Sequence, residues 1–200
     1  QYLQSEDLPG DSEEMLQVVI DETDRLNVVV SQFLDYARTA ELDLEKQHVN
    51  AVASHVLNVV RAQGVPDSIE IVVDFDAALP SIRADGTQLS QVLLNLVQNA
   101  LQAMPEGGCL TVRTRLTHNL LGAGFVEIAV VDTGVGIQPD DLDRLFQPFF
   151  TRKRDGTGLG LAICQRIVQA HGGDIEVQTE PQRGSTFLVR LPLPVAPAEE

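Results

Sequence analysis

Beyond residue 46, the order in which strand-like and helix-like stretches follow one another limits the folds open to this chain. Runs rich in β-branched residues predict strands, and longer runs with apolar residues at helical spacing predict helices. The expected strands cover residues 48–49, 69–75, 81–84, 109–116, 125–131, 175–179 and 185–191, and the expected helices cover 50–63, 86–104 and 161–171. Because these elements mix without strict β-α alternation, the sequence predicts an α+β two-layer sandwich rather than a doubly wound parallel sheet.

The first 45 residues predict a long helix. Its seam positions recur at alternating steps of three and four, the spacing of a coiled coil; they are Leu16, Val19, Thr23, Leu26, Val30, Phe33 and Ala37, widened by Ile20 and Leu34. A turn at 8–12 precedes this helix, so residues 1–7 would end an earlier helix of an antiparallel hairpin. We favour a dimerising bundle, and an amphipathic helix packed on its own domain is the alternative. The expected division is 1–45 for part of a helical hairpin, 46–192 for a compact domain and 193–200 for a disordered tail.

The charge of the chain limits its partners. It has 200 residues, with 29 acidic and 14 basic side chains and a net charge of −15. A negative field repels phosphate backbones and anionic lipid, so we expect neither nucleic acid nor a membrane surface as a partner. An anionic nucleotide would need positive potential created locally by backbone N–H groups, a few cations and a metal ion. The two cysteines, Cys109 and Cys164, show no disulfide framework spacing, which favours a cytoplasmic location.

Two asparagines interrupt the apolar helix expected at 86–104. Asn95 and Asn99 lie four residues apart and therefore on one face. Amides on an apolar face must find partners, so a pair of satisfied core amides is one interpretation. The other is a ligand site, since a carboxamide oxygen can bind magnesium and its nitrogen can donate to a phosphate.

Two glycine-rich turns follow. Asp132 ends an apolar strand, and Gly134 and Gly136 come directly after it; the acid could accept from an amino group such as that of adenine, while the glycines admit a flat ring. Alone, this is ordinary turn chemistry. Gly156, Gly158 and Gly160 alternate with other residues just before a helix, which indicates a phosphate site at the positive helix end. Neither a P-loop nor a dinucleotide fingerprint fits these glycines, and a flexible linker is the alternative.

Phenylalanines and cations cluster between these two turns. Residues 145–154 hold three of the seven phenylalanines and three of the fourteen Lys and Arg residues. The aromatic residues could anchor a mobile loop while the cations reach a polyphosphate. A solvated basic turn beside a small apolar cluster is the alternative, but the local reversal of sign in an acidic chain favours an anionic ligand.

These four stretches resemble, in order and spacing, the N, G1, F and G2 boxes of sensor histidine kinases, a branch of the gyrase-like ATPases. The resemblance covers residues 12–192, including the ending Gly184–Pro192, and the sequences at 95–104 and 149–153 are most similar to the nitrogen-regulation subgroup. It implies the histidine kinase/gyrase-type α/β sandwich, preceded by a helix of the dimerisation and phosphoacceptor hairpin. It also implies ATP and Mg²⁺ as ligands, and a role in two-component signal transduction.

The resemblance further implies a role for each site residue. Asn99 would bind Mg²⁺, with Asn95 near the γ-phosphate; Asn95 and Lys153 are the expected catalytic residues. Asp132 would read the adenine amino group. Gly134, Gly136 and Ile137 would shape that pocket, and Thr186 would contact the base through water. Residues 138–157 would form a lid over ATP, and the phosphates would be cradled by the amides of Gly156, Thr157, Gly158, Leu159, Gly160 and Leu161.

The residue at position 95 favours phosphoryl transfer over hydrolysis. Gyrase-type ATPases place a water-activating glutamate there, whereas an amide such as Asn95 is not a useful general base. The four histidines, His48, His55, His118 and His171, lack the acceptor context of the family, and we expect structural roles for them. We therefore expect the acceptor histidine to precede residue 1, homodimerisation through the hairpin, and relay to the receiver domain of a response regulator. A gyrase-class hydrolase, or a nucleotide-binding dimerisation module without transfer, are the alternatives.

Overall fold

The computed structural model describes residues 15–23, 26, 30, 34, 42–119, 121–153 and 156–194 of the chain. The chain divides into two units, Gln1–Thr39 and Ala40–Glu200. In the first unit, residues 15–23 are helical, and apolar seam residues such as Val19, Leu26 and Val30 are exposed. The turn at 8–12, the preceding hairpin helix, Phe33, Ala37 and most of the tail lie outside the described residues, so the predicted division at 45/46 and the bundle remain predictions.

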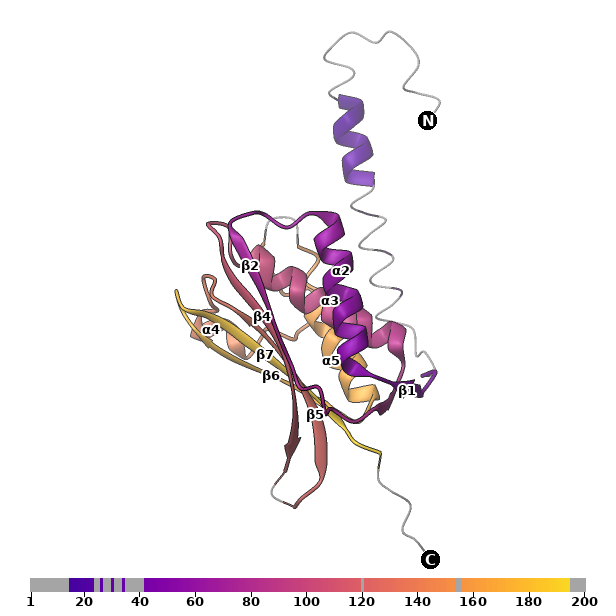
Figure 1. The fold of residues 1–200 in the computed structure, drawn as a ribbon. Helices are drawn as coiled ribbons and strands as arrows, with labels where there is room; N and C mark the ends of the chain where they lie inside the picture. The colour runs from indigo at the N-terminus through magenta and orange to yellow at the C-terminus, as the bar shows by residue number, and fades with distance from the viewer. Residues whose placement is uncertain are drawn as a thin grey trace, which may run out of the picture. The chain divides into compact units, whose positions relative to one another are not determined.

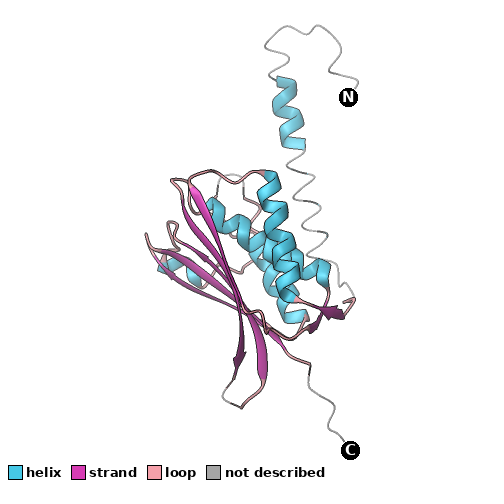
Figure 2. Ribbon diagram, viewed as in Figure 1, coloured by secondary structure: helices cyan, strands magenta, loops and turns pink. Residues whose placement is uncertain are grey.

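The second unit is an α+β sandwich of two layers, as predicted. Three helices cover one face of a mixed sheet and leave the other face open (Figures 1 and 2). In chain order the elements are β1 (Glu45–Gln47), α2 (Val49–Gln63), β2 (Ile69–Phe75), β3 (Ile82–Ala84), α3 (Gly86–Gln102), β4 (Gly108–His118), β5 (Gly124–Asp132), α4 (Pro139–Leu142), α5 (Gly160–Ala170), β6 (Asp174–Glu180) and β7 (Gly184–Pro192).

The main sheet has five strands in the order β2-β4-β5-β7-β6. Only the β2–β4 pair among these is parallel; β4–β5, β5–β7 and β6–β7 are antiparallel. The short strands β1 and β3 form a separate antiparallel pair. In the central strand β5, Asp132 is the last residue, paired with Leu110 on one side and Ser185 on the other.

The core lies between the helices and the sheet. Alternate residues of β5, including Val126, Ile128 and Val130, are buried against the helical layer, as the twofold period of a strand requires. From α3, the buried positions are Leu89, Val92, Leu93, Leu96, Val97 and Ala100, which together form one face of the helix. Burying these large apolar side chains fixes the position of α3, and therefore of the polar residues on its remaining surface.

Helix α3 begins at a well-formed cap. Oδ1 of Asp85 accepts from the backbone N–H groups of Thr87 and Gln88, each over 3.0 Å. Burial raises the pKa of Asp85, but N–H donors from Gln88, Asp43 and Thr87 outweigh it, so the pKa lies below its usual value. The backbone N–H of Asp85 donates to Nε2 of His171 over 3.0 Å, which ties this cap to the end of α5.

Predicted and observed bounds differ at most elements, usually by one or two residues. Three of the differences involve β1, α3 and α4. The strand expected at 48–49 lies at Glu45–Gln47, because the His48 carbonyl accepts from Ala51 and Val52 and so already belongs to the start of α2. Helix α3 ends at Gln102 rather than at residue 104. The stretch expected to be irregular contains the short helix α4, whose signals are a proline at its first position and acids in its first turn.

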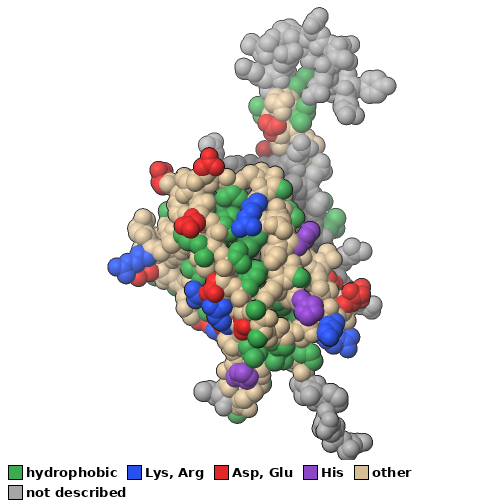
Figure 3. Space-filling model, in the orientation of Figure 1, with side chains coloured by type: hydrophobic (Ala, Val, Ile, Leu, Met, Phe, Trp, Pro, Cys, Tyr) green, Lys and Arg blue, Asp and Glu red, His purple; other side chains and the backbone are tan. Residues whose placement is uncertain are grey.

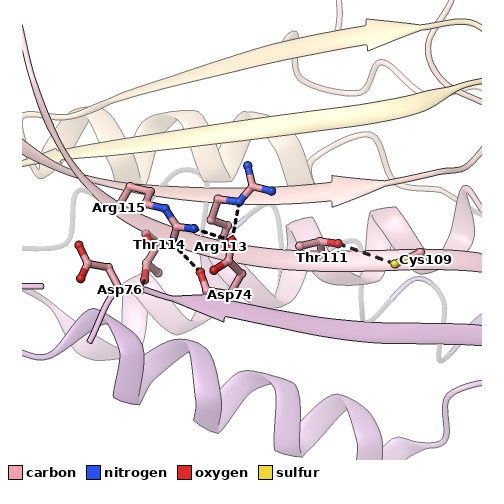
Figure 4. Close-up of polar contacts among 7 residues, drawn as sticks. All are labelled: Asp74, Asp76, Cys109, Thr111, Arg113, Thr114 and Arg115. Atoms are coloured by element: carbon pink, nitrogen blue, oxygen red, sulfur yellow. Dashed lines mark hydrogen bonds and ion pairs between the residues drawn. The ribbon is translucent and has the colours of Figure 1, made fainter. Parts of the chain in front are cut away.

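Charged side chains form ion pairs on the open face of the sheet at strands β2 and β4. Asp74 accepts from Arg113 over 3.0 Å and from Arg115 over 2.5 Å, between neighbouring strands β2 and β4 (Figure 4). Hydrogen bonding to Arg115 lowers the pKa of Asp74. On the side of the molecule in Figure 3, Lys and Arg side chains occur in separate small groups among acidic and hydrophobic ones. Within the described part of the chain, no helix has the length and apolar character needed to cross a membrane.

Candidate nucleotide-binding site

Helix α3 carries two carboxamides on a surface that faces α5. Asn95 and Asn99 lie one turn apart, and both are half-buried. Nδ2 of Asn95 donates to the carbonyl of Gly160, the first residue of α5, over 3.5 Å. Because both amides stay partly exposed, they line a surface of the domain rather than its apolar core, which argues against the core-amide interpretation.

Lys153 reaches the same helix from the segment before α5. Its Nζ donates to Oδ1 of Asn99 over 2.7 Å and also to Oε1 of Gln102. Partial desolvation lowers the pKa of Lys153, although the residue as a whole stays exposed. The structure thus brings two predicted residues into contact and adds a third, Gln102, which the sequence analysis missed. Its spacing of three from Asn99, on the same helix face, is the sequence signal that could have identified it.

Asp132 is a nearly buried acid at the end of the central strand. The residue is 4% exposed, and its Oδ1 accepts from the backbone N–H of Gly134 over 2.8 Å. Burial raises the pKa of Asp132, while hydrogen bonds from the backbones of Gly134 and Ser185 oppose that rise. A carboxylate has about four acceptor positions, so two N–H donors leave room for a ligand that donates.

The glycines after Asp132 permit close backbone contacts. A β-carbon on Gly134 would collide with the carbonyl of Ala103, and one on Gly136 would collide with the carbonyl of Glu180. Gly136 also has a φ of +66°, which favours glycine. Farther along, the N–H of Ile137 donates to Oγ1 of Thr179 over 2.9 Å, so Ile137 is positioned by β6.

The sheet register separates Thr186 from Asp132. Ser185 is the residue paired with Asp132, whereas Thr186 is paired with Val131. Directly paired residues place their side chains on the same face of a sheet, and the next residues along face the other way. Ser185 is therefore on the Asp132 side and is buried, and Thr186 is on the open side. The structure therefore places the predicted Thr186 on the opposite face of the sheet from Asp132. Ser185 lies on the Asp132 face instead, and its Oγ lies 3.0 Å from Oγ1 of Thr179.

The glycine-rich stretch before α5 contacts the phenylalanine-containing segment 145–154. Gly158 has a φ of +68°, and a β-carbon there would collide with the backbone of Phe149. The N–H of Phe149 donates to the Gly158 carbonyl over 3.0 Å, and the N–H of Leu159 donates to Oγ1 of Thr157 over 3.3 Å. Helix α5 then starts at Gly160, so the amides of Gly160 and Leu161 are among the first of the helix, which lack intrahelical acceptors. Contacts of this kind argue against the flexible-linker interpretation.

The cations beside the phenylalanines have different partners. Arg152 forms a two-pronged ion pair with Asp141 of α4, with N···O distances of 2.5 and 2.7 Å. Hydrogen bonding to Arg152 lowers the pKa of Asp141, whose side chain is 8% exposed. The guanidinium of Arg144 lies 4.5 Å above the ring of Phe150, at cation–π distance. Arg152 is thus engaged in holding this segment to α4, while Lys153 points to α3.

Backbone contacts connect the Asp132 turn to the helix that carries Asn99. The N–H of Val135 donates to the carbonyl of Ala103, and the N–H of Ala103 donates to the carbonyl of Asn99, each over 3.0 Å. At the other side, Asn95 contacts the start of α5. The strand-end acid, the two carboxamides, Lys153 and the first amides of α5 therefore belong to one connected region of the domain.

This region suits an anionic ligand that has a hydrogen-bond donor group and is bound together with a cation. Helix N-termini and an ammonium group attract phosphate oxygens, and a buried carboxylate accepts from an amino group. Oδ1 of Asn99 already accepts from the Lys153 ammonium, so that oxygen faces a position that a cation can occupy. Since carboxamide oxygens and phosphate oxygens are ligands that Mg²⁺ accepts, the residues present fit a magnesium nucleotide.

Comparison with known sequences identifies similar proteins. A family profile described as "Histidine kinase-, DNA gyrase B-, and HSP90-like ATPase" matches residues 84–195. The sensor histidine kinase ZraS of Salmonella typhi is 41% identical over 184 residues, which cover 92% of this chain and 39% of that protein. The signal transduction histidine-protein kinase AtoS of Escherichia coli K12 is 38% identical over 181 residues, 90% of this chain and 29% of that protein. The chain thus spans well under half the length of these relatives.

Solved structures give the same result for the fold. Full-length ShkA in complex with AMPPNP superposes with a TM-score of 0.79 at 29% identity, over 97% of this chain and 41% of that one. Histidine kinase ThkA in complex with response regulator protein TrrA superposes with a TM-score of 0.74 at 26% identity, over 94% of this chain and 53% of that one. The predicted fold class is confirmed.

Proposed function

Because the chain belongs to the family of histidine kinase-, DNA gyrase B- and HSP90-like ATPases, we propose that it is the ATP-binding catalytic part of a sensor histidine kinase. Its activity would be transfer of the γ-phosphate of ATP to a histidine side chain. The observation that carries the choice is Asn95, an amide placed beside the first residue of α5. A side chain that cannot accept a proton at neutral pH suits a site that presents a phosphoryl group to an outside nucleophile.

We assign the nucleotide contacts as follows. Asp132 would accept from the adenine amino group, with Gly134, Gly136 and Ile137 forming the adjoining wall. Ser185 replaces Thr186 as the expected neighbour of the base, since it shares the Asp132 face of the sheet. The phosphate contacts would come from Lys153, Asn95 and the amides of Gly156, Thr157, Gly158, Leu159, Gly160 and Leu161. The amides of Gly156 and Leu159 donate to the Lys153 carbonyl and to Oγ1 of Thr157, each over 3.3 Å, and would exchange these partners for phosphate oxygens.

Asn99 is the residue proposed to hold Mg²⁺. When bound, the ion would neutralise phosphate charge beyond what Lys153 and the amides of α5 supply. The protein's own contribution is to position the nucleotide and to surround the phosphates with fixed donors from α5 and Lys153. The segment 138–157, tied to α4 through Arg152 and Asp141, would cover the phosphates.

Hydrolysis in the manner of gyrase is the second candidate, and Asn95 argues against it. A water-activating carboxylate is required at that position, and the amide provides no comparable base. The relatives named above are histidine kinases, and ThkA was solved with a response regulator. By analogy we propose a receiver domain of a response regulator as the partner that takes the phosphoryl group, and homodimerisation through the helical hairpin in the cytoplasm.

A mixing experiment tests transfer. The chain is incubated with γ-labelled ATP and a separate hairpin that carries an acceptor histidine. Label on the hairpin is the expected result, and an Asn95→Ala variant should lose it while still binding ADP. Steady release of free phosphate would instead support a hydrolase, and binding with neither outcome would support a module without transfer.

The contact of Lys153 with the phosphates can be measured in the same protein. The sequence has two lysines, Lys46 and Lys153, so acetylation of each can be followed by mass spectrometry with Lys46 as the internal standard. Saturating Mg-ADP should slow acetylation of Lys153 relative to Lys46. Equal rates with and without nucleotide would refute the contact.

A further inference from the structure

Two neutral carboxamides hold the ammonium group of Lys153. Its Nζ donates to Oδ1 of Asn99 over 2.7 Å and to Oε1 of Gln102, one turn farther along α3. These oxygens satisfy hydrogen bonds of the ammonium without neutralising its charge. The next residue back, Arg152, is by contrast paired with the carboxylate of Asp141. The positive charge of Lys153 is thus held in place and is still able to attract an anion.

Contacts made by the residues just before Lys153 also fix its position. Arg152 fastens the segment to α4, and Oγ1 of Thr151 accepts from the backbone N–H of Lys153 over 3.0 Å. Gln102 acts from the opposite side, as a second acceptor beyond Asn99. An ammonium bound to one amide alone could pivot about it, whereas two acceptors one helical turn apart define its position.

The oxygen that holds Lys153 is the one assigned to the metal. Two cations on one oxygen would repel each other strongly in a partly desolvated site. From this geometry, and resting on the proposed function, we propose that Gln102 is a positioning residue that keeps Lys153 over Asn99 in the nucleotide-free protein. Lys153 and Mg²⁺ then compete for Oδ1 of Asn99, and Lys153 is the principal cation at the phosphates when the metal is absent.

The proposal has a specific consequence for nucleotide affinity. Gln102→Leu removes one acceptor from Lys153, so ADP binding without Mg²⁺ should weaken roughly three- to tenfold. This is less than direct loss of a hydrogen bond to a charged group would cost, because Gln102 acts only through the position of Lys153. With saturating Mg²⁺, affinity should be unchanged or slightly higher, because Lys153 no longer competes as well for Asn99. The gain that Mg²⁺ provides is the ADP dissociation constant without Mg²⁺ divided by the constant with Mg²⁺. This ratio therefore increases in Gln102→Leu.

Calorimetric titration of the full chain with ADP, with Mg²⁺ or with EDTA, tests this consequence. The proteins are wild type, Gln102→Leu, Lys153→Met and the double variant. Gln98→Leu is the matched control, since Gln98 lies on the same helix and has no described contact with Lys153. Gln102 is exposed, so its substitution should leave the thermal unfolding midpoint unchanged.

The expected result is a larger Mg²⁺ gain in Gln102→Leu, and no further effect of that substitution once Lys153 is methionine. An equal loss with and without Mg²⁺, or a loss that persists in the Lys153→Met background, would overturn the proposal. So would an unchanged affinity in EDTA. Failure of the proposed function has a different signature: wild type would not bind ADP at all, or would bind it equally well after Asp132→Asn.

Discussion

Asp132→Asn should lower the affinity for nucleotide without lowering the stability of the fold. In the wild type, Oδ1 of Asp132 is occupied by the N–H of Gly134 at 2.8 Å. An asparagine would keep its oxygen at that position, because only the oxygen can accept, and would therefore turn its NH₂ toward the adenine pocket. The adenine amino group would then face a donor instead of a carboxylate oxygen. Loss of a hydrogen bond to a charged group is worth about 1.5–3 kcal/mol, so ADP affinity should fall roughly ten- to 150-fold.

The same substitution should not weaken the fold. Burial raises the pKa of Asp132. A carboxyl group whose pKa is raised in the folded state contributes stability that is present below its unfolded-state pKa and is lost as pH rises through the folded-state pKa. At neutral pH the ionised carboxylate is therefore unfavourable, and Asp132→Asn should unfold at the same temperature as wild type or higher.

Calorimetric titration with ADP and thermal unfolding at neutral pH measure the two effects together. Asp74→Asn is the control, because Asp74 is also a strand aspartate but lies on the open face of the sheet (Figure 4). It should bind ADP as wild type does. An Asp132→Asn protein that is stably folded and binds ADP with unchanged affinity would refute the adenine contact.

Three further predictions concern Asn99, His171 and Arg152. Asn99→Ala should shrink the gain in ADP affinity that Mg²⁺ provides, the opposite of the effect expected for Gln102→Leu; equal losses with and without the metal would argue against a metal ligand. His171→Ala should lower the free energy of unfolding by about 1–3 kcal/mol, since its ring nitrogens contact both the N–H of Asp85 at 3.0 Å and the carbonyl of Ile167 at 2.8 Å; a denaturation curve that matches wild type would contradict this. Arg152→Met should alter acid stability: hydrogen bonding to Arg152 lowers the pKa of Asp141, so the pair stabilises the fold above the unfolded-state pKa and is lost as pH falls through the folded-state pKa. Unfolding temperatures of wild type and variant should therefore converge at low pH, and parallel curves would refute the pairing.

Much of the site could be predicted from the sequence, because its polar residues and glycines stand at positions where helices and strands usually have other residue types. Two amides on an apolar helix face, an acid after an apolar strand and alternating glycines before a helix each have a structural interpretation when taken alone. Their order and spacing together indicate a binding site. Asn99 and Lys153 do lie in contact, and Asn95 does lie at the start of α5. The assignment of ligands to these residues stays a prediction.

Two residues could not be identified in this way. An exposed glutamine near the end of a helix is ordinary, so its spacing of three from Asn99 is a weak signal. The approach of Lys153 from more than fifty positions away is what distinguishes Gln102. The choice between Ser185 and Thr186 depends on the register of β5 and β7, where an offset of one residue moves a side chain to the opposite face. Hydrophobic alternation is weak here, since Ser185, Phe187, Leu188 and Val189 are all buried.

His171 also shows how a tautomer follows from geometry. We expected a structural role for this histidine. The N–H of Asp85 can only donate, so Nε2 must carry a lone pair, and Nδ1 then donates to the Ile167 carbonyl. The ring is therefore neutral in this arrangement, and it acts as a bridge between two helices rather than as a charge at the end of one.

That bridge, together with the contact of Asn95 and Gly160, joins both ends of α5 to α3. Because these contacts connect the two helices, we expect nucleotide binding to leave the spacing of α3 and α5 unchanged. Binding affinity and dissociation rate would then be set by different parts of the chain. The affinity would depend on α3 and α5, and the dissociation rate on the residues between β5 and α5. Exchanging that intervening stretch among relatives offers a way to change how long product stays bound while leaving the choice of nucleotide as it was.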